Sequence, residues 1–433
     1  MKKTLLALTA LLSLTSLAGD DCRPRGDGRA AVIGDPVPGL TPSQLALFNA
    51  GKALYQHEFS VAEGLGPIFN RQSCAACHGA PVVGGSDPEG TANNVTHFMI
   101  NNQGNFMPAL EFGGPVIQQR SIESVPGGGG CHLQPEAVPP LPGVTTSHRH
   151  TPPVFGFGLL DAVPDAEILA WQGPRQWKDP SVVGAANWGT EMESLVRLQA
   201  FTFDITRKQP AGIARVGRFG WKAQTPTIFQ FSAEPFNIEL GVSSPFFPRE
   251  NHPQGQALPP ECQLAGTQPN DSGSQKSVAL YQFQALIGAP PSLPKSPRAK
   301  YGEFLFRATG CADCHRASMR TVKDYYLAKA DGTAERVDAL SDKEIFPYSD
   351  LLVHDMGPGL EDGRVMGRAG GRFWRTTPLW GNRFKPRYLH DGRAATIDEA
   401  IDLHGGEATR SQQLYEALNP QQEAALLEFI NTL

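Results

Sequence analysis

The sequence has no excess of positive charge and no long apolar run beyond its first residues. Its 38 lysines and arginines are outnumbered by 43 aspartates and glutamates, and the formal net charge is −5 at pH 7. A chain without a basic field is not expected to bind nucleic acid, and no internal run is long and apolar enough to form a transmembrane segment. At 433 residues, 40% of them apolar, the chain exceeds the size at which one hydrophobic core stops growing, so two domains are expected.

The N-terminus has the pattern of a secretory signal peptide. The stretch MKKTLLALTALLSLTSLAGDDC combines two lysines, an apolar run and small residues at Ser16 and Ala18, which is typical of such a signal. We therefore expect residues 1–18 to be cleaved, residues 19–39 to form a flexible leader, and the protein to be periplasmic or otherwise exported. Cys22 follows two aspartates and does not come directly after LAG, which favours a soluble exported protein over a lipoprotein.

Cysteine is scarce, and four of the seven cysteines share one arrangement, C-x-x-C followed directly by histidine. The two copies consist of Cys74, Cys77 and His78, and of Cys311, Cys314 and His315. In this spacing two thiols can add to the vinyl groups of one haem while the histidine, on the same turn, delivers an imidazole to the iron. A redox dithiol or half of a zinc site does not need a histidine at that position. The sequence therefore predicts two covalently bound haem c groups.

Three cysteines lie outside these motifs. Cys131 and Cys262 both lie in loops rich in glycine and proline between the two haem motifs. In an exported protein such a pair is expected to form a disulfide. Cys22 would then be left over in the leader.

Helix signals frame each haem motif. Before the first motif, Thr41 is a candidate N-cap, followed by Pro42 and by Gln44 three residues after the cap. The closing helix of this unit is expected at 277–287, and APPSLPKSP at 289–297 reads as a stiff linker. The second motif is preceded by RAKYGEFLFRATG and followed, at the chain end, by a helix capped by Asn419.

These signals predict a mainly α fold with two cytochrome c-like haem domains, residues 40–290 and 296–433, and long loops rich in glycine and proline. A minimal haem domain needs on the order of 100 residues, so the first domain would carry a large insertion at residues 120–265. Loops of that length are usually functional. We expect them to form the wall of one haem pocket and the contact between the domains.

A histidine near the C-terminus stands out on a predicted short helix. TIDE at 396–399 resembles a capping box, and His404 continues the apolar spacing set by Ile397 and Ile401 before two glycines end the helix. Such a histidine is either satisfied by a carbonyl at the helix C-terminus or acts as a metal ligand.

Several segments together resemble the di-haem oxidoreductase family, sometimes labelled thiol oxidoreductase-like. They are FNRQSCAACHG, GRFGWKAQTPT, LFRATGCADCH, YSDLLVHDMGPGLEDG, WRTTPLWG and YLHDGRAATIDEAIDLHGGEA. That family is similar to bacterial di-haem cytochrome c peroxidases and to the MauG maturases. The resemblance implies a mostly helical pair of cytochrome c domains, with a catalytic N-terminal haem and an electron-transfer C-terminal haem.

The resemblance also implies ligands for the C-terminal haem. In the related groups, a residue at the end of a helix after H-D-G is the sixth ligand, Met in one group and Tyr in the other. Here that position is His404, which predicts a haem with two histidine ligands. Met356 in HDMG is the alternative ligand. His354 and His390 are expected to hold loops or to contact haem propionates.

For the N-terminal haem, the related pockets contain Gln, Pro and Glu in that order. TIFQFSAEPFNIELG offers Gln230, Pro235 and Glu239 at similar spacing. A carboxylate over an open iron site can move a proton between the two oxygens of a peroxide; the alternative for Glu239 is a solvated loop carboxylate. Trp221 is a candidate relay between the haems, or a core residue. His97 is an alternative that would close the iron as a sixth ligand.

The sequence thus predicts an exported di-haem oxidoreductase, peroxidase-like, with hydrogen peroxide as oxidant and a small redox protein as electron donor or acceptor. A non-catalytic di-haem electron carrier is one alternative. A MauG-like or oxygenase activity on a partner protein or organic substrate is another. The related peroxidases also hold calcium between the domains, but no acidic cluster in this sequence marks such a site.

Overall fold

The computed structural model describes residues 32–433 except 91–94, 103–104, 108–111, 114, 129, 175–179, 191–202, 205–208, 211–213, 264–269 and 272. The predicted signal peptide, residues 19–31 of the leader and Cys22 lie outside the described residues. No helix in the described part of the chain has the length and apolar character needed to cross a membrane.

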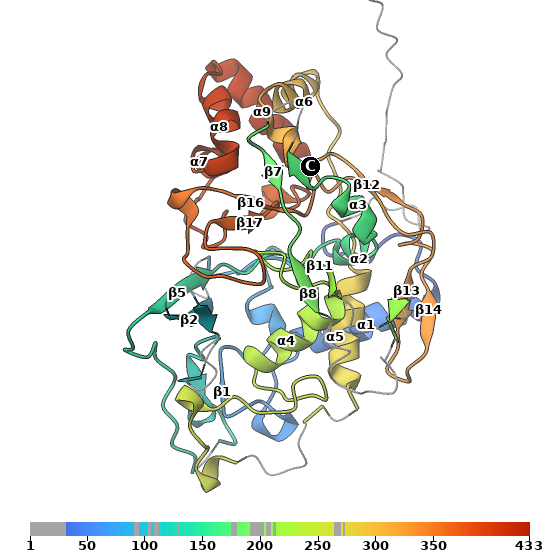
Figure 1. The fold of residues 1–433 in the computed structure, drawn as a ribbon. Coiled ribbons are helices and arrows are strands. Elements are labelled where there is room, and N and C mark those ends of the chain that lie inside the picture. Colours follow the sequence, from blue (N-terminus) through green and yellow to red (C-terminus); the bar gives the residue numbers. More distant parts are fainter. Residues whose placement is uncertain are drawn as a thin grey trace, which may run out of the picture.

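The helices in the described part of the chain lie mostly in two groups (Figure 1). They are α1 (Pro42–Gln56), α2 (Phe157–Asp161), α3 (Asp165–Leu169), α4 (Ile228–Ile238), α5 (Gln275–Leu286), α6 (Pro297–Ala308), α7 (Ile397–Asp402), α8 (Thr409–Glu416) and α9 (Pro420–Thr432). α6 to α9 gather at one end, and α1, α4 and α5 lie toward the other. The capping box at Thr41 and the cap at Asn419 are confirmed.

Each haem motif lies beside one pair of crossing helices, α1 with α5 and α6 with α9. A glycine lets the backbones approach at each crossing. A Cβ on Gly51 would lie 2.3 Å from the carbonyl oxygen of Ala279, and a Cβ on Gly302 would lie 1.9 Å from that of Ala425. Any side chain at these positions would collide with the partner helix.

An aromatic ring follows each of these glycines by four residues and therefore lies on the same helix face. Tyr55 packs 4.8 Å from Phe283 between ring centroids, and Phe306 packs 5.3 Å from Phe429. The same two rings lie near the motif histidines, Tyr55 at 5.9 Å from His78 and Phe306 at 6.3 Å from the histidine of the second motif. One packing arrangement is thus used twice in the chain.

The strands are short and lie in the long loops. They are β1 (Ile68–Phe69), β2 (Val95–Asn102), β3 (Asn105–Met107), β4 (Arg120–Ser121), β5 (Val144–Arg149), β6 (Gly173–Pro174), β7 (Val183–Gly184), β8 (Trp188–Thr190), β9 (Phe203–Asp204), β10 (Gln209–Pro210), β11 (Ala214–Val216), β12 (Met319–Arg320), β13 (Tyr326–Ala328), β14 (Ala334–Arg336), β15 (Glu344–Ile345), β16 (Val353–Asp355) and β17 (Phe373–Arg375). The longest sheet has the order β3, β2, β5, and the other described sheets are antiparallel pairs.

The predicted disulfide between Cys131 and Cys262 is confirmed. It joins two loops that are 131 residues apart in sequence. Both cysteines are almost completely buried, so the bond fixes the inserted loops to the core at the first haem unit.

The hydrophobic cores do not follow the predicted boundary between residues 290 and 296. One core contains residues of α1, α4 and α5 together with Tyr325, Leu327, Val337 and Leu340 from after the second haem motif. A second, smaller core is formed by α6, α9 and their neighbours. The segment from Met319 to Ile345 therefore packs on the first haem unit although it follows the second motif in sequence, whereas Tyr348 belongs to the second core.

The inserted loops reach the C-terminal half of the chain. Ala185 forms a β-bridge with Val353, the side-chain amide of Asn187 donates to the Met366 carbonyl at 2.9 Å, and the amide of Arg375 donates to the Trp221 carbonyl at 2.8 Å. These contacts are the ones expected of an insertion that joins two haem units.

Candidate functional site

The first haem motif lines a large cavity. Cys74 begins the 3-10 turn η2 (Cys74–Ala76), and Cys77 and His78 follow it. All three line a space of about 1310 Å³ free of protein atoms, part of it open to solvent. The carbonyl of Gly85 accepts a hydrogen bond from Nδ1–H of His78 at 3.3 Å, which leaves Nε2 for a metal. Burial lowers the pKa of His78 to about 4, so the ring is neutral, as metal ligation requires.

The second motif lines a similar cavity of about 1800 Å³, also partly open to solvent. Nδ1 of His315 donates to the carbonyl of Tyr348 at 2.9 Å. Burial lowers the pKa of His315 to about 4, and the nearby ring of His404 contributes to this shift. His315 and His404 line the same cavity.

His404 lies two residues beyond the end of α7. The N-cap Thr396 accepts from the backbone N–H of Glu399 at 3.1 Å as predicted, but the Glu399 carboxylate returns to the backbone N–H of Ala395 and not to the cap residue. Nδ1 of His404 donates to the Ala400 carbonyl at 2.6 Å, so its Nε2 is the nitrogen available to a metal. Burial lowers the pKa of His404, which favours the neutral ligand form.

Met356 lines the same cavity as His404. The two candidate ligands lie on adjoining segments, because a Cβ on Gly405 would be only 3.0 Å from the Met356 carbonyl oxygen. His354 has both ring nitrogens within hydrogen-bond distance of carboxylates, and His390 stacks on Trp374 with centroids 3.7 Å apart. The two carboxylates occupy both ring nitrogens of His354, so this ring is not placed as an iron ligand. The expected role of His390, in holding a loop or contacting a propionate, stays a prediction.

Two acidic side chains line the first cavity. Glu239, the C-cap of α4, lines it and accepts a hydrogen bond from Nδ2 of Asn70 at 2.6 Å. Burial raises the pKa of the Glu239 carboxyl to about 7. Pro235 also lines the cavity, whereas Gln230 does not. The side-chain oxygen of Gln230 is buried and has no hydrogen-bond partner among the described residues.

Glu234, which the sequence pattern did not single out, lines the same cavity from α4. Burial raises the pKa of this carboxyl too, while Arg364 opposes the shift. Its position directly before Pro235, in the segment already singled out, was the available signal. The predicted alternative ligand His97, on β2, also lines this cavity, and no residue that the structure describes forms a hydrogen bond with its buried Nδ1.

A sequence model described as "Di-haem oxidoreductase, putative peroxidase" matches residues 142–433. The chain belongs to this di-haem oxidoreductase family. The match confirms the resemblance and implies two haem cofactors. The matched range includes the second haem motif, Glu239 and His404, and the first motif precedes it. No curated protein matches the chain.

Solved structures with low similarity span almost the whole di-haem oxidoreductase chain. A MauG-like protein associated with microbial copper homeostasis is 15% identical, with 94% of each chain covered and a TM-score of 0.38. The diheme peroxidase BthA from Burkholderia thailandensis is 14% identical, with 95% of this chain and 92% of that chain covered and a TM-score of 0.38. Hydrazine synthase from Kuenenia stuttgartiensis is 12% identical, with both chains fully covered and a TM-score of 0.35.

The residues around both cavities fit a haem with its two propionate groups. Arg149 and Arg364 line the first cavity and Arg375 lines the second, and each is at most 7% exposed. Among the described residues, one terminal nitrogen of Arg149, one of Arg375, and Nε and one terminal nitrogen of Arg364 are buried without a hydrogen-bond partner. Buried guanidinium groups normally find acceptors, and a propionate supplies the carboxylate that Arg binds best.

Trp221 lies between the two cavities and lines both of them, as does His150. The indole N–H of Trp221 donates to the His150 carbonyl at 2.8 Å. The predicted relay residue is thus placed where it could connect the two haem sites.

In the described residues, no group of three or more His, Cys, Asp and Glu side chains could hold a further metal ion, so calcium stays a prediction without a site.

Proposed function

We propose that this di-haem oxidoreductase is an exported c-type peroxidase with two cytochrome c-like units and unequal haem roles. Cys74 and Cys77 attach one haem, and Cys311 and Cys314 attach the other. The N-terminal site reduces hydrogen peroxide. The C-terminal site exchanges electrons with a small redox protein.

The difference between the two cavities carries this proposal. In the C-terminal cavity, His315 and His404 each have Nδ1 held by a carbonyl and Nε2 available, which is the pattern expected for an iron with two histidine ligands. In the N-terminal cavity, His78 has this pattern, and the further polar groups include the carboxyls of Glu239 and Glu234. An electron-transfer site needs two ligands, and a peroxidase site needs a proton-transfer group.

The protein residues at the N-terminal site would handle protons and orientation. The haem, when bound, supplies an iron that can exchange electrons. Glu239, with its pKa at about 7, can take the proton from one peroxide oxygen and return it to the other at neutral pH. The side-chain amide of Asn70 holds one oxygen of this carboxyl in place. Trp221, which lines both cavities, is the proposed path for electrons between the sites.

Low-temperature EPR of the oxidised protein and hydrogen peroxide titration of the half-reduced protein test this proposal. We expect the EPR spectrum to contain one low-spin signal from a haem with two histidine ligands, and we expect His404→Ala to lose this signal. We also expect the Soret band to respond to peroxide. Glu239→Gln should lose that response while the spectra of both haems stay intact. Met356→Leu is the matched ligand variant and should leave the low-spin signal unchanged.

The opposite result would identify a simple electron carrier. Two low-spin signals that stay unchanged after half-reduction, together with no response to peroxide, would mean that the N-terminal iron has no open site. In that case His97→Ala should create a peroxide-sensitive haem, because His97 lines this cavity with its Nδ1 free of any partner.

A further inference from the structure

Two carboxylates enclose the ring of His354 beside the C-terminal cavity. Nε2 of His354 lies 3.0 Å from Oδ2 of Asp350, and Nδ1 lies 2.8 Å from Oε2 of Glu407. His354 and Asp350 are each at most 1% exposed. A carboxylate accepts hydrogen bonds, so this geometry requires both ring nitrogens to donate. We call Asp350, His354 and Glu407 the clamp.

Glu407 connects the clamp to the segment that bears His404. It follows His404 by three residues, after the two glycines. Its other acceptor contacts are to backbone N–H groups, from Val183 to Oε2 at 2.7 Å and from Asp355 to Oε1 at 3.1 Å. One carboxylate thus ties together the inserted loop, β16 and the His404 turn.

The two glycines allow the His404 turn to lie directly on the backbone at β16. Gly406 has a φ of +57°, and a Cβ there would lie 2.1 Å from the Asp355 carbonyl oxygen. A Cβ on Gly405 would be 3.0 Å from the carbonyl oxygen of Met356. The turn has no room to shift toward β16, and Glu407 prevents it from moving away.

The clamp also reaches the haem-attachment turn. The sulfur of Cys314 lies 3.6 Å from Nδ1 of His354, and the backbone N–H of Asp350 donates to the Cys314 carbonyl at 3.0 Å. A haem attached at Cys314 would therefore be linked, through three side chains, to the turn that carries its second ligand. Side chains that orient metal ligands in this way often matter almost as much as the ligands.

We propose that Asp350, His354 and Glu407 are positioning residues that hold His404 on the C-terminal haem iron in preference to exogenous ligands and to Met356. This inference rests on the proposed ligation by His404. Without Glu407, three N–H groups lose an acceptor: the backbone N–H groups of Val183 and Asp355 and the ring Nδ1–H of His354. The turn bearing His404 then loses its attachment to β16.

Cyanide binding to the oxidised holoprotein measures how strongly His404 is kept on the iron, because His404 competes with cyanide for the same iron position. We expect Glu407→Gln to raise the apparent cyanide affinity of the C-terminal haem on the order of 10–100-fold, followed as loss of the EPR signal with two histidine ligands. The cyanide affinity of His404→Ala, which has no histidine to compete, sets the upper limit of this increase. Glu416→Gln, which removes the same charge from an exposed position on α8, should leave the affinity at the wild-type value.

His354→Gln provides a second test if Glu407→Gln does not incorporate haem, and we expect the same direction of change. Suppose that the wild type shows two histidine ligands while a folded Glu407→Gln or His354→Gln protein has unchanged cyanide affinity. That result would overturn the proposed role of the clamp and leave the ligation by His404 standing. A sulfur-to-iron charge-transfer band in the wild type would instead show that Met356 is the ligand. That result would overturn the proposed His404 ligation and the clamp with it.

Discussion

The hydrogen bond on Nδ1 distinguishes three candidate ligand histidines from His354. His78, His315 and His404 each donate Nδ1–H to a backbone carbonyl, at 3.3, 2.9 and 2.6 Å. Such a bond fixes the tautomer and the orientation of the ring and makes Nε2 a better ligand. His354, whose two nitrogens both face carboxylates, cannot offer a lone pair. The partner of the ring, more than its position in a motif, indicates its role.

At the same scale, the raised pKa of Glu239 predicts a pH dependence of the peroxide reaction. The carboxyl is protonated below its pKa of about 7 and ionised above it, and only the ionised form can accept a proton. The rate of the half-reduced protein with hydrogen peroxide should therefore rise through about pH 7 and level off above it. Stopped-flow measurements on Glu239→Gln should show a rate lower by roughly 10²–10⁴-fold and no such pH dependence.

Glu234→Gln is the matched comparison, because this second carboxyl lines the same cavity. We expect it to retain the rise in rate near neutral pH. If Glu234→Gln abolished the pH dependence and Glu239→Gln kept it, the role of proton acceptor would belong to Glu234.

At the scale of elements, the two helix crossings depend on glycine and on a ring four residues later. The pairs are Gly51 with Tyr55 in α1, and Gly302 with Phe306 in α6. The crossing brings each ring against its partner helix and near a motif histidine. The haem motif of each unit is thus positioned by helix packing and not by the strands.

Gly302→Ala should destabilise the holoprotein by about 1–3 kcal/mol, the usual cost of overpacking a tight contact. The added methyl group would lie 1.9 Å from the Ala425 carbonyl oxygen, so α6 and α9 would have to separate. Denaturant unfolding monitored by circular dichroism measures the change. Gly359→Ala is the control, since a Cβ at Gly359 meets nothing within 4 Å, and we expect a change within about 0.5 kcal/mol. Equal stabilities for the two variants would contradict this account of the crossing.

At the scale of the whole molecule, a buried charge cluster joins the two halves of the chain. Oδ2 of Asp362 lies 2.5 Å from Arg149 and 2.6 Å from the hydroxyl of Ser147, and Oδ1 lies 3.2 Å from Nζ of Lys222. Burial opposes ionisation of Asp362, but Arg149 and Lys222 hold its pKa below the ordinary value. The stabilisation is thus present above the pKa of the unfolded chain and is lost as the pH falls through the folded pKa.

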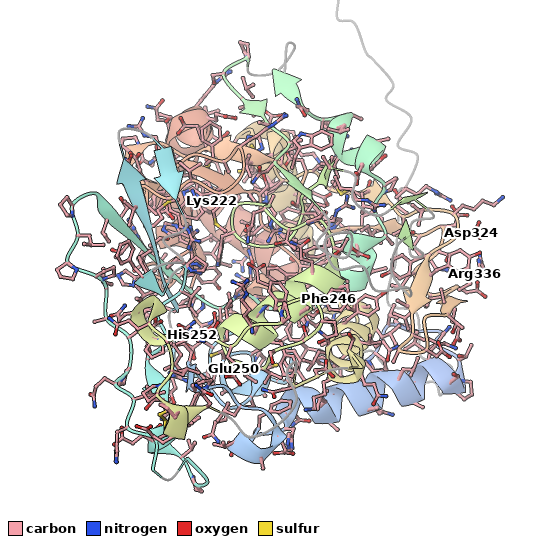
Figure 2. The ribbon with its side chains drawn as sticks, turned by 60° about the horizontal axis from the view of Figure 1, so that its bottom comes forward. Lys222, Phe246, Glu250, His252, Asp324 and Arg336 are labelled. Carbon is pink, nitrogen blue, oxygen red and sulfur yellow. A yellow bond between two sulfur atoms is a disulfide. The ribbon has the colours of Figure 1, made fainter. Side chains whose placement is uncertain are left out.

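Asp362→Asn should destabilise the protein by about 3–5 kcal/mol, because it leaves two buried cations without their carboxylate. Figure 2 shows Lys222 within the body of the molecule and Asp324 with Arg336 at its outer edge. Asp324→Asn removes a carboxylate from that partly exposed ion pair and should cost about 1 kcal/mol or less. Thermal unfolding at neutral pH compares the stabilities of the two variants. If Asp362→Asn lost no more stability than Asp324→Asn, the role of the cluster would be contradicted.

The sequence by itself determined the features that depend on neighbours within about one helical turn. The haem motifs, the caps at Thr41 and Asn419, and the short helix before His404 are local patterns, because capping and motif chemistry involve residues i to i+4. The sequence also favoured a disulfide between Cys131 and Cys262, because both lie in loops between the haem motifs, but Cys22 remained as well and only the structure shows the bond.

Only the tertiary structure decided which distant residues meet. It brings Arg364 to the cavity of Glu234 and Glu239, adds the segment from Met319 to Ile345 to the core of the first haem unit, and keeps Gln230 out of the cavity. It also attaches Glu407 to His354 and Val183. These contacts join segments that are tens to hundreds of residues apart, and their choice depends on burying apolar surface while giving every buried charge a partner, which no local pattern encodes.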